Sequence, residues 1–443
     1  MNFQRGLRAG IFVLLVLTGC AKKDKTLNVE GPYSPVIANL ASDNEPPVRG
    51  TSNVLTALLN NPRGLPVQYH WSTTAGVLAD STTATVHWTP PNAIGEYPVT
   101  VAITAHDDLN DVNFYKTRTF VLHVDNEFER WTHTPSVQFD VVAPTAGKMY
   151  FSQIRNPSTN ESDIWSLDGP LGSPTQVTSQ FWQATSPTVQ SDGSRVVFLG
   201  RATLGVKPSL YVVPSTGGDT TSAAIVIQTA ISTNTFIGPA DFEPSGSELA
   251  YSTDTLGLNL TRPKPWMRDM AVPAQPVPIL PGTNTTTDNT TYLGPSWNGA
   301  GDSVLIVGYQ NFGAPSQQSR GVFKFAATGN PPNNPGPPYT PWLNDPLARE
   351  PDWSPDGQHV VFSKISPGQS DRDIWIINAN ATDPALAVRV TRGPADESHP
   401  RFSSDGTKIF FLSDRTDGYG ANGVYETERR GVNIWSVSRF DLP

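Results

Sequence analysis

The chain has 443 residues, of which 41 are proline and 36 are glycine, while charged residues make up only 16%. This length has room for two or three domains, and the many turn-forming residues favour an all-β protein over a helical one. The formal net charge is −9, and no basic stripe is present to displace counterions from phosphates, which argues against nucleic acid as a partner. Cys20 is the only cysteine, so an intramolecular disulfide is excluded.

Residues 1–20 have the pattern of a secretory leader. Arg5 and Arg8 give a basic start, and an apolar run over residues 11–17 follows. This run is too short to span a bilayer as a stable anchor. Removal of the leader, with its two basic residues and no acidic ones, would change the net charge from −9 to −11.

The end of this leader, Leu-Thr-Gly-Cys at residues 17–20, resembles a bacterial lipobox. The resemblance implies that Cys20 is lipidated and becomes the mature N-terminus, which would anchor the protein to a membrane of the bacterial cell envelope. By resemblance to enteric sorting rules, Ala21 favours the outer membrane. The alternative is a free cysteine after an ordinary signal peptide. Residues 21–31 are expected to form a polar tether.

Residues 32–127 carry the alternating pattern of several β-strands. Runs at 67–71, 85–88 and 97–103 alternate between apolar and polar residues. A central Trp71 and a late Gly-x-Tyr-x-Val-x-Val strand resemble an immunoglobulin-like sandwich of the bacterial PKD-like kind. We expect Trp71 to lie in the core and the Tyr97 hydroxyl to bond backbone. Exposed sugar stacking by Trp71 or Trp88 is the less favoured alternative.

One loop of this unit is acidic. Four side chains with oxygen atoms lie within five positions and could together bind Ca²⁺, namely Asp107, Asp108, Asn110 and Asp111. The spacing lacks the glycine and the final glutamate of an EF-hand loop. A solvated acidic turn is therefore the preferred interpretation, and no cofactor is predicted.

A turn phrase recurs along residues 128–443. Its clearest copy is Trp-Ser-Pro-Asp-Gly at 353–357, followed by an apolar run at 360–362. Proline presets φ and glycine accepts positive φ, so each copy predicts a tight turn between two antiparallel strands. The turn glycines of the six copies are Gly147, Gly193, Gly246, Gly301, Gly357 and Gly406. Successive glycines are 46, 53, 55, 56 and 49 residues apart, which is about the length of one four-stranded propeller blade.

Each copy is followed by a further strand with an aromatic or apolar centre, at residues 163–167, 209–213, 264–267, 321–325, 373–377 and 433–437. The turn phrase, the apolar strand, an Asp-Ile-Trp strand and a Val-Thr ending resemble the TolB-type propeller repeat of bacterial envelope proteins. The resemblance covers residues 128–443 and implies a propeller that binds a protein or peptide at one face or along its axis.

The two ends of this repeat region are expected to meet. Only six residues follow the last strand at 433–437, which is too few for another outer strand. Residues around Trp131 resemble the segments that precede later repeats, so we expect them to supply the missing strand. The fold prediction is therefore an immunoglobulin-like β-sandwich followed by a six-bladed β-propeller that an N-terminal strand closes.

Three stretches depart from a compact repeat, at residues 256–291, 330–341 and 414–430. Long insertions in a propeller project as surface loops, where binding specificity often resides. The alternative, that they are only tolerated spacers, is slightly preferred.

Enzyme signatures are missing from the sequence. It contains no Gly-x-Ser-x-Gly elbow, dinucleotide or phosphate loop, or His-Glu-x-x-His motif. His133, His359 and His399 are the histidines of the repeat region, and one or two histidines at the axial mouth would not be enough to supply three metal ligands. His399 can face the axial mouth, although a turn histidine bonded to backbone is the preferred interpretation.

Carboxylates in this region recur with the repeat. Asp192, Asp356 and Asp405 stand at the same position of the turn phrase, so we expect them to cap turns rather than catalyse. Asp163 and Asp373, each before Ile-Trp, are expected to be structural for the same reason. No catalytic or metal-binding residue is predicted.

These observations favour a lipid-anchored envelope protein that binds or scaffolds, not an enzyme. Its expected partners are the membrane, through Cys20, and an envelope protein or peptide, through the propeller. A surface propeller that binds or degrades glycans is the alternative, suggested by eleven tryptophans and loops rich in Thr and Asn. A purely structural spacer is the third possibility.

Overall fold

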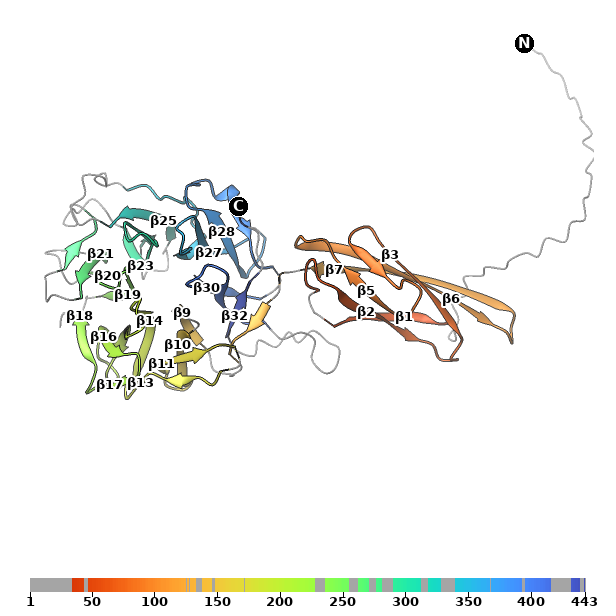
Figure 1. The fold of residues 1–443 in the computed structure, drawn as a ribbon, viewed down its shortest axis with the longest axis horizontal. Helices are drawn as coiled ribbons and strands as arrows, with labels where there is room; N and C mark the ends of the chain where they lie inside the picture. Colours follow the sequence, from red (N-terminus) through yellow and green to blue (C-terminus); the bar gives the residue numbers. More distant parts are fainter. Residues whose placement is uncertain are drawn as a thin grey trace, which may run out of the picture. The chain divides into compact units, whose positions relative to one another are not determined.

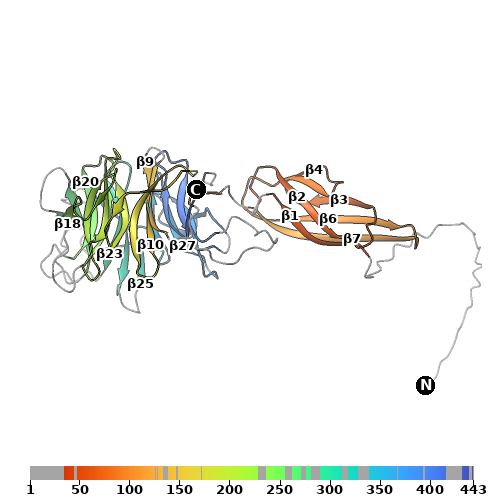
Figure 2. The ribbon, with the colours of Figure 1, turned by 90° about the horizontal axis from the view of Figure 1, so that it is seen from below.

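The computed structural model describes residues 34–43, 47–124, 126, 128–132, 138–145, 148–170, 172–227, 236–254, 262–270, 276–280, 290–311, 318–327, 339–366, 368–392, 395–415, 432–438 and 442. Contacts divide the chain into two compact units. The first holds β1 to β7 and the second holds β8 to β32, as Figures 1 and 2 show by colour along the chain. In the described part the fold is all-β, with one short 3-10 helix, η1 (Pro384–Leu386). None of the described helices is long and apolar enough to cross a membrane.

The first unit contains two antiparallel sheets. One has the order β1-β2-β5-β4 and the other β3-β6-β7. The strands are β1 (Val36–Ser42), β2 (Asn53–Asn60), β3 (Val67–Thr73), β4 (Val77–Ala79), β5 (Thr85–Thr89), β6 (Gly95–Asp107) and β7 (Val112–Val124).

Both tryptophans of this unit lie in its core. Trp71 is 2% exposed and donates its indole N–H to the carbonyl of Thr83 at 2.8 Å. Trp88 is fully buried and donates to the carbonyl of Ala75 at 3.2 Å. The core position expected for Trp71 is confirmed, and sugar stacking by either indole is wrong. Tyr97 is half-buried in β6, and the backbone bond expected of its hydroxyl stays a prediction.

The second unit repeats one antiparallel arrangement around a common axis (Figure 1). The first strands of the successive sheets are β9 (Gln138–Thr145), β14 (Gln183–Val189), β19 (Ile237–Phe242), β23 (Thr291–Trp297), β26 (Arg349–Trp353) and β30 (Glu397–Phe402). The second strands are β10 (Lys148–Asn156), β15 (Arg195–Arg201), β20 (Glu248–Thr253), β24 (Ser303–Gln310), β27 (His359–Ile365) and β31 (Ile409–Ser413).

The third strands are β11 (Glu161–Asp168), β16 (Ser209–Pro214), β21 (Lys264–Asp269), β25 (Gln318–Ala326), β28 (Arg372–Asn378) and β32 (Asn433–Val437). Outer strands are short and comprise β12 (Thr175–Gln176), β18 (Ala224–Ile227), β22 (Val277–Pro278), β29 (Val388–Arg389) and β8 (Phe128–Arg130). β13 (Thr178–Ser179) pairs with β17 (Gly218–Asp219), and one parallel pair, Ser162 with Gln183, joins the first two repeats into an eight-stranded sheet.

The recurring phrase forms the turn between the first and second strands, as expected. The described turn glycines all have the positive φ that an L side chain adopts only with strain, from 69° at Gly357 to 76° at Gly246. The aspartates before three of them cap the turn: Asp356 accepts from the N–H of Gln358 at 3.0 Å, and Asp405 from that of Thr407 at 3.0 Å. The structural assignment of these carboxylates is confirmed, whereas Gly147 lies outside the described residues.

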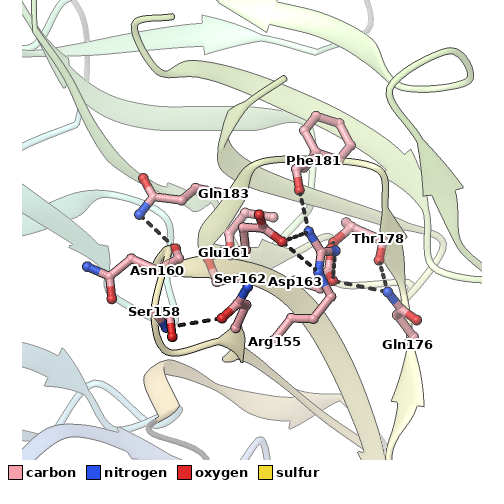
Figure 3. Close-up of polar contacts among 12 residues, drawn as sticks. Arg155, Ser158, Asn160, Glu161, Ser162, Asp163, Gln176, Thr178, Phe181 and Gln183 are labelled. Atoms are coloured by element: carbon pink, nitrogen blue, oxygen red, sulfur yellow. Dashed lines mark hydrogen bonds and ion pairs between the residues drawn. The ribbon is translucent and has the colours of Figure 1, made fainter. Parts of the chain in front are cut away.

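Asp163 and Asp373 join the third strand to the outer strand. The hydroxyl of Thr178 donates to Asp163 at 3.4 Å and accepts from the N–H of Ile164 at 2.9 Å. Figure 3 shows Arg155 beside these residues, where its guanidinium donates to Asp163 at 2.5 Å, to Glu161 at 3.0 Å and to the Phe181 carbonyl at 3.1 Å. Burial raises the pKa of Asp163, and Arg155 counteracts that rise. The side chain is therefore structural, as expected.

Residues before the first repeat pair with the last one. β8 is antiparallel to β32, with Arg130 opposite Trp435. The same register places Arg389 opposite Trp375 and Gln176 opposite Trp165 in the other repeats. The expectation that residues around Trp131 supply the missing outer strand is confirmed.

The first strands of the repeats also contact one another in a cycle. β9 contacts β14, which contacts β19, and the succession continues through β23, β26 and β30 back to β9. Apolar side chains fill the spaces between neighbouring sheets. Between the last sheet and the first, Met149 and Phe151 pack with Trp131, Phe410 and Ile434.

The prediction of a surface loop is partly wrong for one of the three insertions. Residues 256–291 include β21 and β22, which are the third and outer strands of their sheet rather than a surface loop. Of these two strands the sequence indicates only the first, weakly, at 264–267, because Pro265 and Pro278 interrupt the apolar alternation expected of a strand. Most of 330–341 and 414–430 lies outside the described residues.

Candidate functional site

Every first strand from β14 to β30 is interrupted by a dipeptide that ends in proline. The interruptions fall at Ser186-Pro187, Gly238-Pro239, Gly294-Pro295, Glu350-Pro351 and His399-Pro400, where pairing with the second strand skips two residues. Proline has no N–H to donate to the ladder, so it is tolerated in a strand at a bulge. The repeated Pro therefore places an irregularity at the same level of each sheet.

Three residues at this level adopt a costly backbone conformation. Ser186, Glu350 and His399 have φ values of 50°, 53° and 53°, a region that a residue before proline normally avoids. Such a conformation costs about 1–3 kcal/mol per residue and often marks functional positions. Gly294 reaches φ 66° without that cost, and a Cβ built on it would find no atom within 4 Å.

Polar side chains just after the bulges link neighbouring sheets. We call Thr188, Asp241, Ser296, Asp352 and Arg401 the axial belt. Thr188 Oγ1 donates to Asp241 at 3.1 Å, and the other oxygen of Asp241 accepts from the N–H of Trp297 at 3.0 Å. Ser296 donates to Asp352 at 3.1 Å, and Asp352 accepts from the N–H of Phe402 at 2.9 Å. Each carboxylate therefore bridges the sheets on either side of it.

The belt carries two acidic groups and one basic group. Burial among protein atoms raises the pKa of Asp241 to about 6, and the charge of Asp352 adds to the rise. Burial likewise raises the pKa of Asp352, while Arg401 counteracts the rise at both carboxylates. The negative charge of the belt therefore increases as the pH rises through about 6.

A second polar group lies at the end of the axis where the first strands begin. We call Tyr309, Arg349, Glu350, Arg372, Asp396 and His399 the axial cluster. Glu350 accepts from the N–H of His399 at 2.8 Å and from the hydroxyl of Ser363 at 2.8 Å. Its second oxygen lies 3.5 Å from Nδ1 of His399 and 3.7 Å from Arg372. Two neighbouring sheets are thus joined through one carboxylate.

Arg372 completes this network. Its guanidinium donates to both oxygens of Asp396, at 3.1 and 3.0 Å, in a bidentate pair. Burial raises the pKa of Glu350, but His399, Arg372 and Ser363 together outweigh burial and lower it. Glu350 is therefore ionised at neutral pH.

A neighbouring pair is more deeply buried. Glu397 is 1% exposed, and one of its oxygens accepts from Arg415 at 2.7 Å. Burial raises the pKa of Glu397 to about 7, and Arg415 counteracts the rise. The guanidinium of Arg415 lies 3.6 Å above the ring of Phe128, which belongs to β8. This contact attaches the edge of the axial cluster to the strand that joins the two ends of the repeat.

The remaining predicted positions do not converge on a site. His399 reaches the axial cluster, but its ring faces Glu350. His359 lies in β27, and His133 and Cys20 lie outside the described residues. Among the described residues no group of three or more His, Cys, Asp or Glu side chains could hold a metal ion.

The acidic loop of the first unit is arranged around two basic side chains. Asp107 accepts from Arg63 and, at 2.7 Å, from Asn110. Asp108 and Asp111 approach His106 instead, at 3.2 and 4.0 Å. The four oxygen-bearing side chains therefore point to different partners, as in the acidic turn that the sequence favours.

Tryptophan side chains are buried or partly exposed, and the partly exposed ones of the second unit are Trp165, Trp182, Trp342 and Trp375. In the second unit, indoles at most 6% exposed belong to Trp131, Trp266, Trp297, Trp353 and Trp435. Across the described residues, Tyr115 is the only large aromatic side chain in the exposed class, at 50%. Among the described residues no tryptophan is in the exposed class, which gives little support to stacking on sugar rings.

Sequence reasoning singled out only His399 of the axial cluster. A usable signal was present, because an X-Pro dipeptide stands at the same distance before the turn glycine in four of the repeats. That spacing marks the bulge. The partners of the bulge residues, such as Arg372 and Tyr309, belong to other strands and follow no shared spacing.

No protein-family model matches the chain, and no curated protein matches it. Several solved structures are similar to it at low identity. TolB from Acinetobacter baumannii has a TM-score of 0.43 at 14% identity, over 85% of this chain and 81% of that one. An oligogalacturonate lyase in complex with manganese has a TM-score of 0.41 at 13% identity, over 88% and 98%. The β-propeller domain of the Trilobed protease from Pyrococcus furiosus has 0.38 at 10%, over 90% and 95%.

The pairing of the strands is enough to assign the second unit to a structural class. Antiparallel groups of three or four strands recur around one axis, and their first strands contact one another in succession. The second unit therefore belongs to an all-β, propeller-like class of protein. Its polar residues converge where the first strands begin.

Proposed function

We propose that this chain is a lipid-anchored binding protein of the bacterial cell envelope, in which a six-bladed propeller binds a protein or peptide partner at the axial cluster. The pairing of β8 with β32 and the cycle of first strands support six blades. The two sheets of the first unit and the buried Trp71 support an immunoglobulin-like spacer. The resemblance of residues 17–20 to a lipobox supports anchoring through Cys20, and Ala21 supports the outer membrane.

The axial cluster is the observation that carries this proposal. Side chains of both charges converge there from the sheets that begin at β23, β26 and β30, and two of them stand on strained bulge residues. Strain is kept where the surroundings require a particular side-chain position. Mixed charges suit recognition of a polypeptide segment because complementary charges give register and specificity.

Catalysis is not part of the proposal. Glu350, Asp396 and Asp241 each accept hydrogen bonds or ion pairs from protein groups that hold them in place. A general acid or base needs its proton-transfer atom available to a substrate. The glycan alternative is disfavoured for a separate reason, since no described tryptophan is in the exposed class and five of those in the second unit are at most 6% exposed.

A photo-crosslinking amino acid in place of Gln310 tests this proposal in membranes that carry the anchored protein. Gln310 is exposed at the end of β24, next to Tyr309 of the axial cluster. Asn380 serves as the matched control, because it is exposed at the opposite end, where Ala379 donates to Gln358 of a turn. We expect a discrete protein crosslink from position 310 and none from position 380.

Other results of the crosslinking experiment would contradict the proposed function. Equal crosslinking from both positions, or from position 380 alone, would place the binding face elsewhere. Absence of a protein crosslink, together with a specific hit of the soluble protein on a glycan array, would replace the proposal by the glycan alternative.

A further inference from the structure

Arg349 differs from the other basic residue of the axial cluster in its pairing. Arg372 is occupied by both oxygens of Asp396 and approaches Glu350. Arg349 uses a single nitrogen, Nη1, for the carbonyls of Pro346 at 2.8 Å and Ala348 at 2.9 Å. Within the described residues no carboxylate lies at ion-pair distance from Arg349. Its Nε and Nη2 therefore keep donors for another acceptor.

The guanidinium of Arg349 is nevertheless held in one orientation. Its central carbon lies 5.4 Å from the centre of the Tyr309 ring, a cation–π contact that helps to hold the guanidinium in place. The two backbone carbonyls fix the Nη1 side. Nε and Nη2 form the remaining edge, which has the geometry that receives both oxygens of a carboxylate.

The neighbouring acids do not compete for this edge. Glu350 directs its oxygens to Ser363, His399 and Arg372, and Asp396 directs both of its oxygens to Arg372. Space is also present in the adjoining sheet at the same level, since Gly294 has no atom within 4 Å of its built Cβ. A ligand group at this end of the axis would thus meet the unpaired edge of Arg349.

From this geometry we propose that Arg349 is the anchor for a carboxylate of the polypeptide partner, so that the propeller recognises an acidic peptide segment. The inference rests on the proposed function and adds the chemical class of its partner. Arg349 would bind the carboxylate in a bidentate pair, while the contact with the Tyr309 ring helps to hold the guanidinium in place.

An acidic peptide is favoured over a uronic acid polymer, which also carries carboxylates. Sugar rings are commonly held by stacking on aromatic faces, and the one aromatic ring of the axial cluster, Tyr309, already faces Arg349. No described tryptophan of the second unit is in the exposed class, and none belongs to the axial cluster.

Calorimetric titration of the mature full chain in detergent tests the inference. The probes are a tetraglutamate peptide with blocked ends, the matching tetraglutamine peptide and a galacturonate oligomer. The variants are Arg349→Gln, which keeps length but removes the charge, and Arg349→Lys, which keeps the charge but removes the planar edge. Arg130→Gln is the matched control, since Arg130 also lies over an aromatic ring, that of Trp435 at 5.8 Å, but on an outer strand.

We expect tetraglutamate to bind the wild type and the Arg130→Gln variant equally, and tetraglutamine to bind neither. Arg349→Gln should lose at least about tenfold in affinity, because a charge-assisted pair is lost. Arg349→Lys should lie between them. Tyr309→Leu, which removes the ring and leaves Arg349 in place, should also weaken binding and serves if Arg349→Gln does not fold.

Other outcomes overturn the inference in distinguishable ways. If tetraglutamate binds Arg349→Gln as well as the wild type, or binds no form of the protein, Arg349 is not a carboxylate anchor, while a partner crosslinked at position 310 would keep the proposed function. Binding of the galacturonate oligomer alone, lost in Arg349→Gln, would overturn the peptide class and the proposed function together.

Discussion

Trp131 donates its indole N–H to the hydroxyl of Ser436 at 3.0 Å, although 305 positions separate the two residues. Its backbone N–H donates to the carbonyl of Ile434 at 2.8 Å, which is the bond that Val177 makes to Ile164 and Val390 makes to Ile374 in other repeats. The start of the repeat region thus substitutes for the outer strand that the last sheet lacks. This pairing removes a sheet edge that would otherwise be exposed.

The first prediction concerns this closure. Trp131 is 6% exposed and packs edge-on against Phe410, with ring centres 4.9 Å apart. Trp131→Ala should lower the free energy of unfolding by about 3–5 kcal/mol, because it leaves a cavity and removes a buried hydrogen bond. Urea unfolding followed by near-UV circular dichroism measures the loss.

Val206→Ala is the control for this measurement. Val206 is 47% exposed, so its truncation should change stability by less than about 0.5 kcal/mol. Wild-type stability of Trp131→Ala would show that the two ends of the repeat do not support each other.

A second prediction separates backbone strain from crowding in the repeated turn. Gly357 has φ 69°, and a Cβ built on it meets nothing within 4 Å. Gly357→Ala should therefore cost about 1–2 kcal/mol through the left-handed conformation alone. Gly357→Asn should cost less, because asparagine tolerates this conformation better. Equal melting temperatures for the two variants would contradict the role assigned to the positive φ.

The third prediction concerns the pH dependence of stability. Burial raises the pKa of Asp241 from 3.8 to about 6 in the folded protein. The folded state therefore holds this proton more tightly than the unfolded state, and the contribution of Asp241 is largest below pH 3.8 and declines as the pH rises to about 6. Asp241→Asn should remove a fall of up to about 1.4 kcal/mol per pH unit in this window.

Asp405→Asn should change the pH dependence of stability in the opposite direction. The hydroxyl of Ser403 and the N–H of Thr407 lower the pKa of Asp405 to about 2. Its contribution is present above pH 3.8 and is lost as the pH falls towards 2. Urea unfolding of both variants over a pH series measures the difference. An unchanged slope between pH 4 and 6 in Asp241→Asn would contradict the raised pKa.

The fourth prediction tests the anchor. Cys20→Ala should move the protein from the membrane fraction to the soluble fraction, since each acyl CH₂ buried in the bilayer contributes about 0.8 kcal/mol. Labelling with a radioactive fatty acid should mark the wild type and not the variant. Thr26→Ala, which lies in the expected tether and leaves residues 17–20 unchanged, is the control. Labelling that persists in Cys20→Ala would show attachment elsewhere.

Much of the fold is readable from local chemistry. Turn phrases such as residues 353–357 specify a reversal because proline and glycine restrict φ at fixed positions. An apolar strand on either side then pairs with its neighbour in sequence. The closing role of Trp131 is readable for a similar reason, since Trp131-Thr132 repeats the pattern of Val177-Thr178 and Val390-Thr391. The strand at Lys264–Asp269 was weak in sequence because Pro265 breaks its alternation.

The axial cluster is a property of the tertiary structure. Arg349 and Tyr309 come from different sheets, as do Glu350 and His399, and neither pair shares a spacing in the sequence. Turn and strand patterns express interactions between residues close in the chain or directly paired in one ladder. Contacts between separate sheets depend on how those sheets are arranged about the axis, which no local pattern encodes. Which edge of Arg349 remains unpaired depends on where the acceptors around it lie, and only the tertiary structure determines their positions.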